Sequence, residues 1–124
     1  MILCDTNILI EFYKGNNGVL ETLNRAGLDN LGVSIVTIGE LYFGAKDKRE
    51  LAKLQKHLSV LKQFELDTET SNIFLELMRE FVLSHKLSVP DGLIAATAIR
   101  HNLLLFTLNV KDFHYLPGLT LYKA

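Results

Sequence analysis

The chain has 124 residues and a formal net charge of −1, from 13 basic and 14 acidic side chains. Hydrophobic residues make up 48% of it and only two residues are proline, which excludes a disordered or collagen-like chain. The near-neutral charge excludes a protein that holds nucleic acid on a broad basic surface, so a polyanionic partner would need a local patch, metal ions or another chain. The length predicts a single domain over residues 1–124.

The N-terminal sequence and the cysteine count predict a cytoplasmic protein. There is no basic stretch of the kind that opens a signal peptide, and Asp5 and Glu11 interrupt the apolar run that such a peptide needs. No apolar stretch approaches the ~20 residues that span a bilayer. The single cysteine, Cys4, cannot form an internal disulfide, so nothing indicates an oxidising compartment. We therefore expect no membrane association.

Short apolar runs alternate with helical patterns along the whole chain. In chain order, the pattern predicts a strand at 2–4, helices at 8–13 and 19–26, a strand at 31–35, helices at 37–45 and 48–62, a strand at 64–66, a long helix after the cap Asp67, a chain break at Pro90, a buried helix that Asp91 opens, and strands at 103–106 and 119–121. This alternation predicts the α/β class, as a three-layer α/β/α sandwich around a central, mainly parallel, Rossmann-like sheet.

Four acids lie close to predicted strand ends and helix starts. Asp5 follows the first strand, Glu40 lies in the first turn of the helix after the second strand, Asp91 opens the buried helix, and Asp112 follows the fourth strand. Ligands bind outside the carboxyl ends of the strands in an open α/β sheet. If the first, second and fourth strands are neighbours, we expect the segments after them to bring the four acids to one place.

A purely structural role explains each acid taken alone. Aspartate is a preferred N-cap, Thr37 and Glu40 have the spacing of a capping box, and Asp112 fits an ordinary turn. Together the acids need compensation, because two carboxylates ~4 Å apart repel by about 4 kcal/mol at an effective dielectric near 20. Mg²⁺ prefers carboxylate, water and phosphate oxygens. The set of acids therefore favours metal-assisted phosphodiester hydrolysis.

Four blocks of the sequence carry a resemblance to a known family. They are Ile-Leu-Cys-Asp-Thr-Asn at 2–7, Ser-Ile-Val-Thr-Ile-Gly-Glu-Leu at 34–41, Asp-Gly-Leu-Ile-Ala-Ala-Thr-Ala at 91–98, and Thr-Leu-Asn-Val-Lys-Asp-Phe at 107–113. In this order and spacing they resemble the motifs of PIN-domain nucleases, in particular VapC-type toxins. The resemblance implies one PIN domain with Mg²⁺- or Mn²⁺-dependent endoribonuclease activity on structured RNA such as tRNA or rRNA. It also implies a cognate antitoxin partner and a homodimer.

The resemblance assigns a role to individual residues. The core metal-binding and catalytic acids would be Asp5, Glu40 and Asp91. Supporting roles would fall to Thr6, Asn7 and Thr107. The fourth motif departs from the pattern, because many PIN domains have an acid where this chain has Asn109. The acid three residues further on, Asp112, is the alternative. Which of the two serves this motif, and whether one or two metal ions act, stays open.

A lysine-rich segment predicts where a partner binds. Residues 46–62 contain six of the thirteen basic residues and two acids, a local charge of +4. This can be the solvated face of an amphipathic helix, or a surface that attracts RNA or an acidic stretch of antitoxin. The predicted partner-binding residues, which would form an apolar groove for a helix, are Leu41, Tyr42, Phe43, Leu54 and Leu58. An arginine of the antitoxin is expected to enter the acid cluster from this groove.

Other functions remain as alternatives. The same fold serves housekeeping RNA-processing nucleases, and the four acids could belong to a non-catalytic interaction domain. Cys4 could be a nucleophile with a histidine as its base, although a cysteine in an apolar strand is more often a core residue. A phosphotransfer enzyme with Asp5 as nucleophile is disfavoured, because Asn7 stands where such enzymes generally need a second acid.

Overall fold

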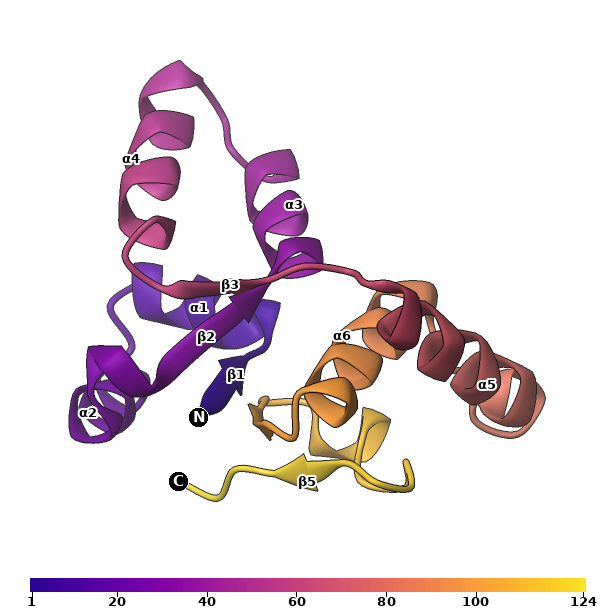
Figure 1. The fold of residues 1–124 in the computed structure, drawn as a ribbon. Helices are drawn as coiled ribbons and strands as arrows, with labels where there is room; N and C mark the ends of the chain where they lie inside the picture. The colour runs from indigo at the N-terminus through magenta and orange to yellow at the C-terminus, as the bar shows by residue number, and fades with distance from the viewer.

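The computed structural model describes all 124 residues and has a five-stranded sheet at its centre (Figure 1). The strands are β1 (Ile2–Cys4), β2 (Leu31–Ser34), β3 (Lys62–Phe64), β4 (Leu104–Phe106) and β5 (Thr120–Leu121). All neighbouring pairs are parallel, in the order β3-β2-β1-β4-β5. Because β1 lies between β2 and β4, the segments that follow these three strands leave the sheet at the same edge, as predicted.

Six α-helices flank the sheet. They are α1 (Thr6–Tyr13), α2 (Asn17–Ala26), α3 (Ile35–Phe43), α4 (Lys48–Leu58), α5 (Thr68–His85) and α6 (Val89–Arg100), with 3-10 turns η1 (Leu28–Asn30) and η2 (Val110–Asp112). Helices α1 to α4 contribute buried residues to one face of the sheet, and α5 and α6 to the other. This arrangement confirms the predicted α/β/α sandwich. No helix is both long and apolar enough to cross a membrane.

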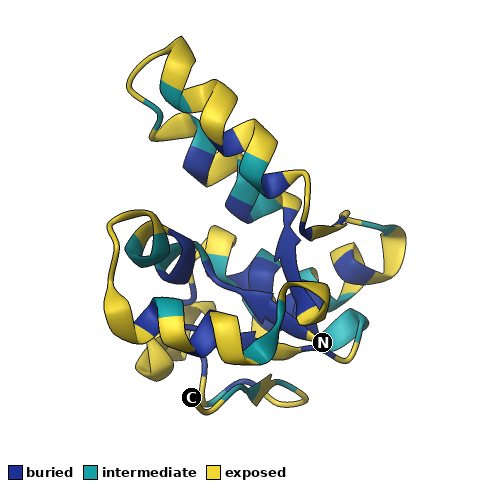
Figure 2. Cartoon of the chain, turned by 90° about the vertical axis from the view of Figure 1, so that its left-hand side faces the viewer, coloured by how far each residue is buried: buried dark blue, intermediate teal, exposed yellow.

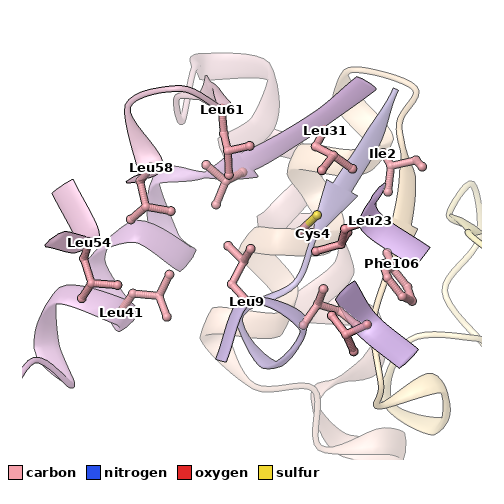
Figure 3. Packing of buried hydrophobic residues seen from close by; sticks show 13 residues of the cluster. Ile2, Cys4, Leu9, Leu23, Leu31, Leu41, Leu54, Leu58, Leu61 and Phe106 are labelled. Carbon is pink, nitrogen blue, oxygen red and sulfur yellow. The ribbon is translucent and has the colours of Figure 1, made fainter. Parts of the chain in front are cut away.

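The two faces of the sheet carry separate hydrophobic cores because side chains alternate along each strand. Ile2 and Cys4 of β1 belong to the core on the side of α1 to α4 (Figure 3). Leu3, between them, belongs to the core on the side of α5 and α6. Strands that are buried on both faces read as continuous apolar runs, which is why β1 and β4 were recognisable from sequence.

Helices α3 and α4 form a hairpin that projects beyond the sheet (Figures 1 and 2). Its inner side is buried through Leu41, Leu54 and Leu58, whereas the tip around Lys46 is exposed (Figure 2). A cleft lies between this hairpin and α1, lined by residues of α1, α3 and α4.

Four helices, α1, α2, α3 and α6, begin two residues earlier than predicted, and in α3 and α6 a serine cap sets the start. The hydroxyl of Ser34 accepts from the backbone N–H of Val36, so α3 begins at Ile35 and Glu40 lies in its second turn. The predicted Thr37–Glu40 capping box is therefore wrong. In the same way, the hydroxyl of Ser88 accepts from the backbone N–H of Asp91 and α6 begins at Val89.

Pro90 therefore lies inside the first turn of α6 instead of breaking the chain before it. A proline is tolerated there because the first-turn N–H groups have no partner within the helix. Asp91 is consequently a first-turn residue and not the N-cap. Its side chain does not occupy the N-cap position that the sequence suggested, and it lines a cavity beside the other acids.

The segment around residue 60 also differs from its prediction. Helix α4 ends at Leu58, not at 62, and β3 spans Lys62–Phe64 where 64–66 was expected. Leu61 continues the apolar spacing of the helix but is buried after the chain has turned. Periodicity alone cannot separate a helix end from a short buried segment.

The close approach of α5 and α6 depends on Gly92. A Cβ atom at this position would lie 3.0 Å from the sulfur of Met78 and 3.1 Å from the ring of Phe74, both on α5. A larger side chain would push the helices apart. The glycine lets α5 pack against the first turn of α6, and so places the C-terminal end of α5 near Asp91.

Candidate active site

Asp5 is the most enclosed acid of the chain, with 4% of its surface exposed. It follows β1, and its backbone N–H donates to the carbonyl of Phe106 at the end of β4. One carboxylate oxygen accepts from the backbone N–H of Thr6 at 2.8 Å and the other from the hydroxyl of Thr107 at 2.8 Å. Asp5 is thus the N-cap of α1, and the structural role considered from sequence is real. The same bonds fix the carboxylate at the edge of the sheet.

A hydroxyl network connects Asp5 to α3. Thr6, next to Asp5, donates its hydroxyl to Glu40 Oε1 at 2.7 Å. The hydroxyl of the fully buried Thr37 lies 3.0 Å from that of Thr6. Thr6 therefore holds one oxygen of Glu40 close to Asp5. Thr37, which sequence reasoning treated as a cap, belongs to the same network.

The loop after β4 is tied to the start of α1. The Asn7 side chain accepts from the backbone N–H of Leu108 at 3.2 Å, and its amide nitrogen lies 3.4 Å from the Thr107 hydroxyl. The Thr107 hydroxyl also accepts from the backbone N–H of Asn109 at 3.0 Å. Asn7 and Thr107 thus join the segment after β1 to the segment after β4.

The electrostatics of Asp5 and Asp91 show that the four acids act on one another. Burial raises the pKa of Asp5, the hydrogen bonds from Thr107 and Thr6 lower it, and the charges of Glu40 and Asp112 raise it. Burial, followed by the charge of Asp5, raises the pKa of Asp91 to about 6, with smaller contributions from Asp112 and Glu40. The structure therefore brings the four predicted acids to one edge of the sheet.

No basic side chain forms an ion pair with these acids. The ion pairs of the chain are Lys14 with Glu11, and Arg100 with Asp67 and Glu69, and none includes a site acid. The four carboxylates also do not form a closed shell, since no three Asp, Glu, His or Cys side chains are placed to enclose a metal directly. Open, uncompensated carboxylates fit Mg²⁺, which keeps several waters and uses one or two protein carboxylates together with substrate phosphates.

The fourth motif contains one acid, Asp112, and this residue lies in η2. Asp112 is exposed at the end of this turn, and its charge acts on both Asp5 and Asp91. Asn109 caps η2 without a side-chain hydrogen bond, and its hydrogen bond to the loop comes from its backbone N–H. The charge of Asp112 thus reaches two of the other predicted acids, whereas Asn109 brings no charge to the loop.

The alternative of a Cys4 nucleophile is contradicted. Cys4 is fully buried in β1, and burial together with the Asp5 charge raises the pKa of its thiol to about 12. A nucleophilic cysteine needs a lowered pKa and access to its substrate. Cys4 is a core residue.

Only two of the five predicted partner-binding residues, Leu41 and Leu54, line a cleft in the structure. A cleft of about 790 Å³ lies between α1, α3 and α4, with Leu41 and Leu54 at its floor and Glu40 in its wall. Leu58 is fully buried in the chain's own core, so its predicted contact with a partner is wrong (Figure 3). Tyr42 is half-buried against the same core, whereas Phe43 is 93% exposed.

The structure adds residues that sequence reasoning missed. A cavity of about 240 Å³ adjoins the acids and is lined by His85, Lys86, Leu87, Ser88, Asp91, Asp112 and Tyr115. His85 ends α5 and Tyr115 follows η2, so their proximity depends on tertiary packing and leaves no local pattern in the sequence. The one available signal was the Ser-x-x-Asp spacing of Ser88 and Asp91, a capping-box pattern.

Comparisons with known proteins agree with this geometry. The sequence profile described as "PIN domain" matches residues 2–118. Ribonuclease VapC10 of Mycobacterium tuberculosis is 33% identical, over 91% of this chain and 86% of its own. The tRNA(fMet)-specific endonuclease VapC of Salmonella typhimurium is 26% identical, over 94% and 92% of the two chains.

The solved structures give the same result. A chain of a toxin–antitoxin complex from Klebsiella pneumoniae matches with a TM-score of 0.82 and 31% identity, over 100% of both chains. The family match spans nearly the whole sheet and all four acids. The chain therefore belongs to the PIN domain family and, within it, to the VapC ribonucleases.

Proposed function

We propose that this chain is the toxin of a toxin–antitoxin module, a single-domain endoribonuclease that cuts structured RNA such as tRNA or rRNA with the help of Mg²⁺. One observation carries the proposal: Asp5, Glu40, Asp91 and Asp112 lie together at the carboxyl edge of the sheet, and none of them forms an ion pair with a basic side chain. The VapC names and the toxin–antitoxin complex among the relatives support the choice of RNA and of an antitoxin partner.

The chain's own residues would prepare this site for a phosphodiester. Asp5 is oriented by two hydrogen bonds and would be the fixed metal-binding carboxylate. Thr6 occupies one oxygen of Glu40 and leaves its second oxygen available. Asp91 and Asp112 line the adjoining cavity, where the RNA strand would pass. Bound Mg²⁺, or Mn²⁺ in its place, would supply Lewis-acid activation of water and stabilise charge on the leaving oxygen.

The proposal is tested by RNA cleavage with purified protein. We expect EDTA to abolish cleavage and Mg²⁺ to restore it, and Asp5→Asn and Asp91→Asn to lower the rate by roughly 100-fold or more, beyond the loss typical of outer-shell changes. Asp29→Asn is the matched control, since Asp29 is an exposed acid in η1, before β2 and so at the opposite edge of the sheet. Cleavage that persists in EDTA and in both site variants would refute metal-dependent hydrolysis at this site.

We propose that the antitoxin binds in the cleft between α1, α3 and α4. Its apolar floor suits a helix, and Glu40 in its wall gives an arginine of that helix a route to the acids. Because Tyr42 supports the core, Ile10→Asp is the better test: Ile10 lines the cleft and is 40% exposed. We expect Ile10→Asp to weaken antitoxin binding, while Val60→Asp, at an exposed site outside the cleft, leaves it unchanged. Equal binding by both variants would place the antitoxin elsewhere.

We also propose that two copies of the chain form a homodimer through α5. Helix α5 exposes Leu75, Val82 and Leu83, and Leu83 is 91% exposed. The three residues lie on one helix, and exposed apolar patches mark interaction surfaces. Light scattering on the isolated wild-type protein is expected to report a dimer. The same measurement on Leu83→Glu is expected to show a shift toward the monomer. A wild-type protein that stays monomeric at high concentration would contradict this part alone.

A further inference from the structure

The cavity beside Asp91 and Asp112 has walls that the motifs do not explain. Two of its seven lining residues are site acids, and the others come from the end of α5, the connection to α6 and the segment after η2. Its volume of about 240 Å³ is enough for part of a nucleotide and too small for a folded partner. A cavity that shares two carboxylates with the site is placed to hold a portion of the molecule on which the site acts.

The wall of this cavity includes a stacked pair of rings. The centroids of His85 and Tyr115 are 3.8 Å apart and their planes differ by 11°. Phe81 packs edge-on against both rings, with its centroid 5.7 Å from that of His85 and 5.3 Å from that of Tyr115. The hydroxyl of Ser84 lies 2.7 Å from Nδ1 of His85. These contacts hold the pair in one orientation, although His85 itself is exposed.

Lys86 brings a positive charge to the same cavity. It is the only lysine or arginine among the lining residues. It also ends α5 in the left-handed conformation, with φ 53° and ψ 41°. Glycine is favoured at such a helix end, and a side chain there costs ~1–2 kcal/mol. A cation in the same wall as two carboxylates is suited to meet a phosphate that approaches the site.

We propose that His85, Tyr115 and Lys86 form a nucleotide-binding subsite, in which one RNA base stacks on the His85–Tyr115 pair and Lys86 contacts a phosphate beside the bond that is cut. The subsite rests on the proposed ribonuclease function. Stacking uses the face of a base and not its hydrogen-bonding edge, so the subsite takes any base but requires it to be unpaired. It therefore selects a loop or single-stranded stretch within a structured RNA.

The first test is equilibrium binding of a short fluorescent single-stranded RNA in Mg²⁺ buffer, with Asp5→Asn present in all proteins to prevent cleavage. His85→Ala is expected to weaken binding about tenfold, the loss typical of one stacked base. His85→Phe keeps a ring and is expected to restore binding to within about threefold of the parent. His114→Ala is the matched control, because His114 is an exposed histidine next to Tyr115 but outside the cavity lining.

The second test is proton NMR of the same parent protein during titration with uridine 5′-monophosphate or adenosine 5′-monophosphate. A stacked base shifts the carbon-bound imidazole protons of His85 upfield and saturates, and Lys86→Gly requires more nucleotide for the same shift. Thermal unfolding of each variant verifies that the loss of binding is not a loss of folding. No shift at His85, or equal RNA affinity of the parent and His85→Ala, would overturn the subsite.

Failure of the subsite and failure of the proposed function give different results. A wild-type protein that cleaves no RNA in Mg²⁺ refutes the proposed function, while the binding and NMR measurements still decide the subsite. A wild-type protein that cleaves RNA, with His85→Ala binding and cleaving equally well, refutes the subsite and leaves the nuclease intact.

Discussion

The hydroxyl of Thr107 stabilises a charge that the fold buries at its centre. It donates to Asp5 Oδ2 at 2.8 Å, and Thr107 is 7% exposed. Thr107→Val keeps the shape of the side chain but leaves one oxygen of a buried carboxylate without its donor. We expect a loss of about 1–3 kcal/mol of unfolding free energy, measured by urea denaturation.

The control for this prediction is Thr120→Val, since Thr120 is an exposed threonine of β5. Its loss should stay within about 0.5 kcal/mol, as is usual for surface substitutions. Equal losses in the two variants would mean that the Thr107 hydroxyl gives Asp5 no specific support. The site and the fold are coupled at this residue, because the same bond orients the carboxylate and joins β4 to α1.

At the level of helices, the start of α5 contains a charge whose contribution depends on pH. Asp67 caps α5 as predicted, accepting from the backbone N–H and the hydroxyl of Thr70 at 2.8 and 2.7 Å. These hydrogen bonds, with help from Arg100, lower its pKa below 3.8. Because the pKa is lower in the folded state than in the unfolded chain, the charged form of Asp67 stabilises the fold at neutral pH. This contribution is lost as the pH falls below about 3.8 and through the lowered pKa of the folded state.

Asp67→Asn tests this, because asparagine retains the capping oxygen and removes the charge. We expect the variant to melt at a lower temperature than the wild type at pH 7, and the difference to narrow as the pH falls below about 4. Asp47→Asn, at the N-cap of the exposed helix α4, makes the matched cap without an arginine partner. If the difference in melting temperature between the wild type and Asp67→Asn widened in acid, the charge of Asp67 would not be what stabilises α5.

The opposite end of α5 gives a prediction of stabilisation. Lys86→Gly relieves the left-handed backbone conformation and is expected to raise the unfolding free energy by about 1 kcal/mol. The same change in the middle of α4, Lys53→Gly, should lower it by about 1 kcal/mol, because glycine weakens a helix interior. Denaturation curves of the two variants decide this. A destabilised Lys86→Gly would show that the Lys86 side chain supports the fold and not only the cavity.

The element order and the four acids were predictable because their signals are local. Continuous apolar runs identified β1 and β4, and the acids followed at fixed short distances. The starts of α3 and α6 were misplaced because competing polar residues, Thr37 and Asp91, resemble caps as well as Ser34 and Ser88 do. The stack of His85 on Tyr115 was not predictable, since the two residues come together only through the packing of α5 on α6 and the loop after β4.

For the molecule as a whole, the cluster of acids that the proposed function requires lowers the stability of the fold. Four carboxylates share one edge of the sheet, and burial with neighbouring charge raises the pKa of Asp91 to about 6. Without a cation, its charged form destabilises the folded state at neutral pH and above. Asp91→Asn should therefore raise the unfolding free energy in EDTA by about 1 kcal/mol, after allowance for solvent screening at this partly exposed position.

Mg²⁺ should make the wild type more stable than Asp91→Asn, the reverse of the order expected in EDTA. A ligand that binds only the folded state adds about 2.7 kcal/mol when its concentration is 100 times its dissociation constant. We expect Mg²⁺ to raise the melting temperature of the wild type well above that of Asp91→Asn, which loses one of the metal-binding carboxylates and responds weakly. Asp29→Asn, remote from the site, should respond as the wild type does. If Mg²⁺ raised all three melting temperatures equally, the cation would be acting on the general surface charge, and the acids at the sheet edge would not be its binding site.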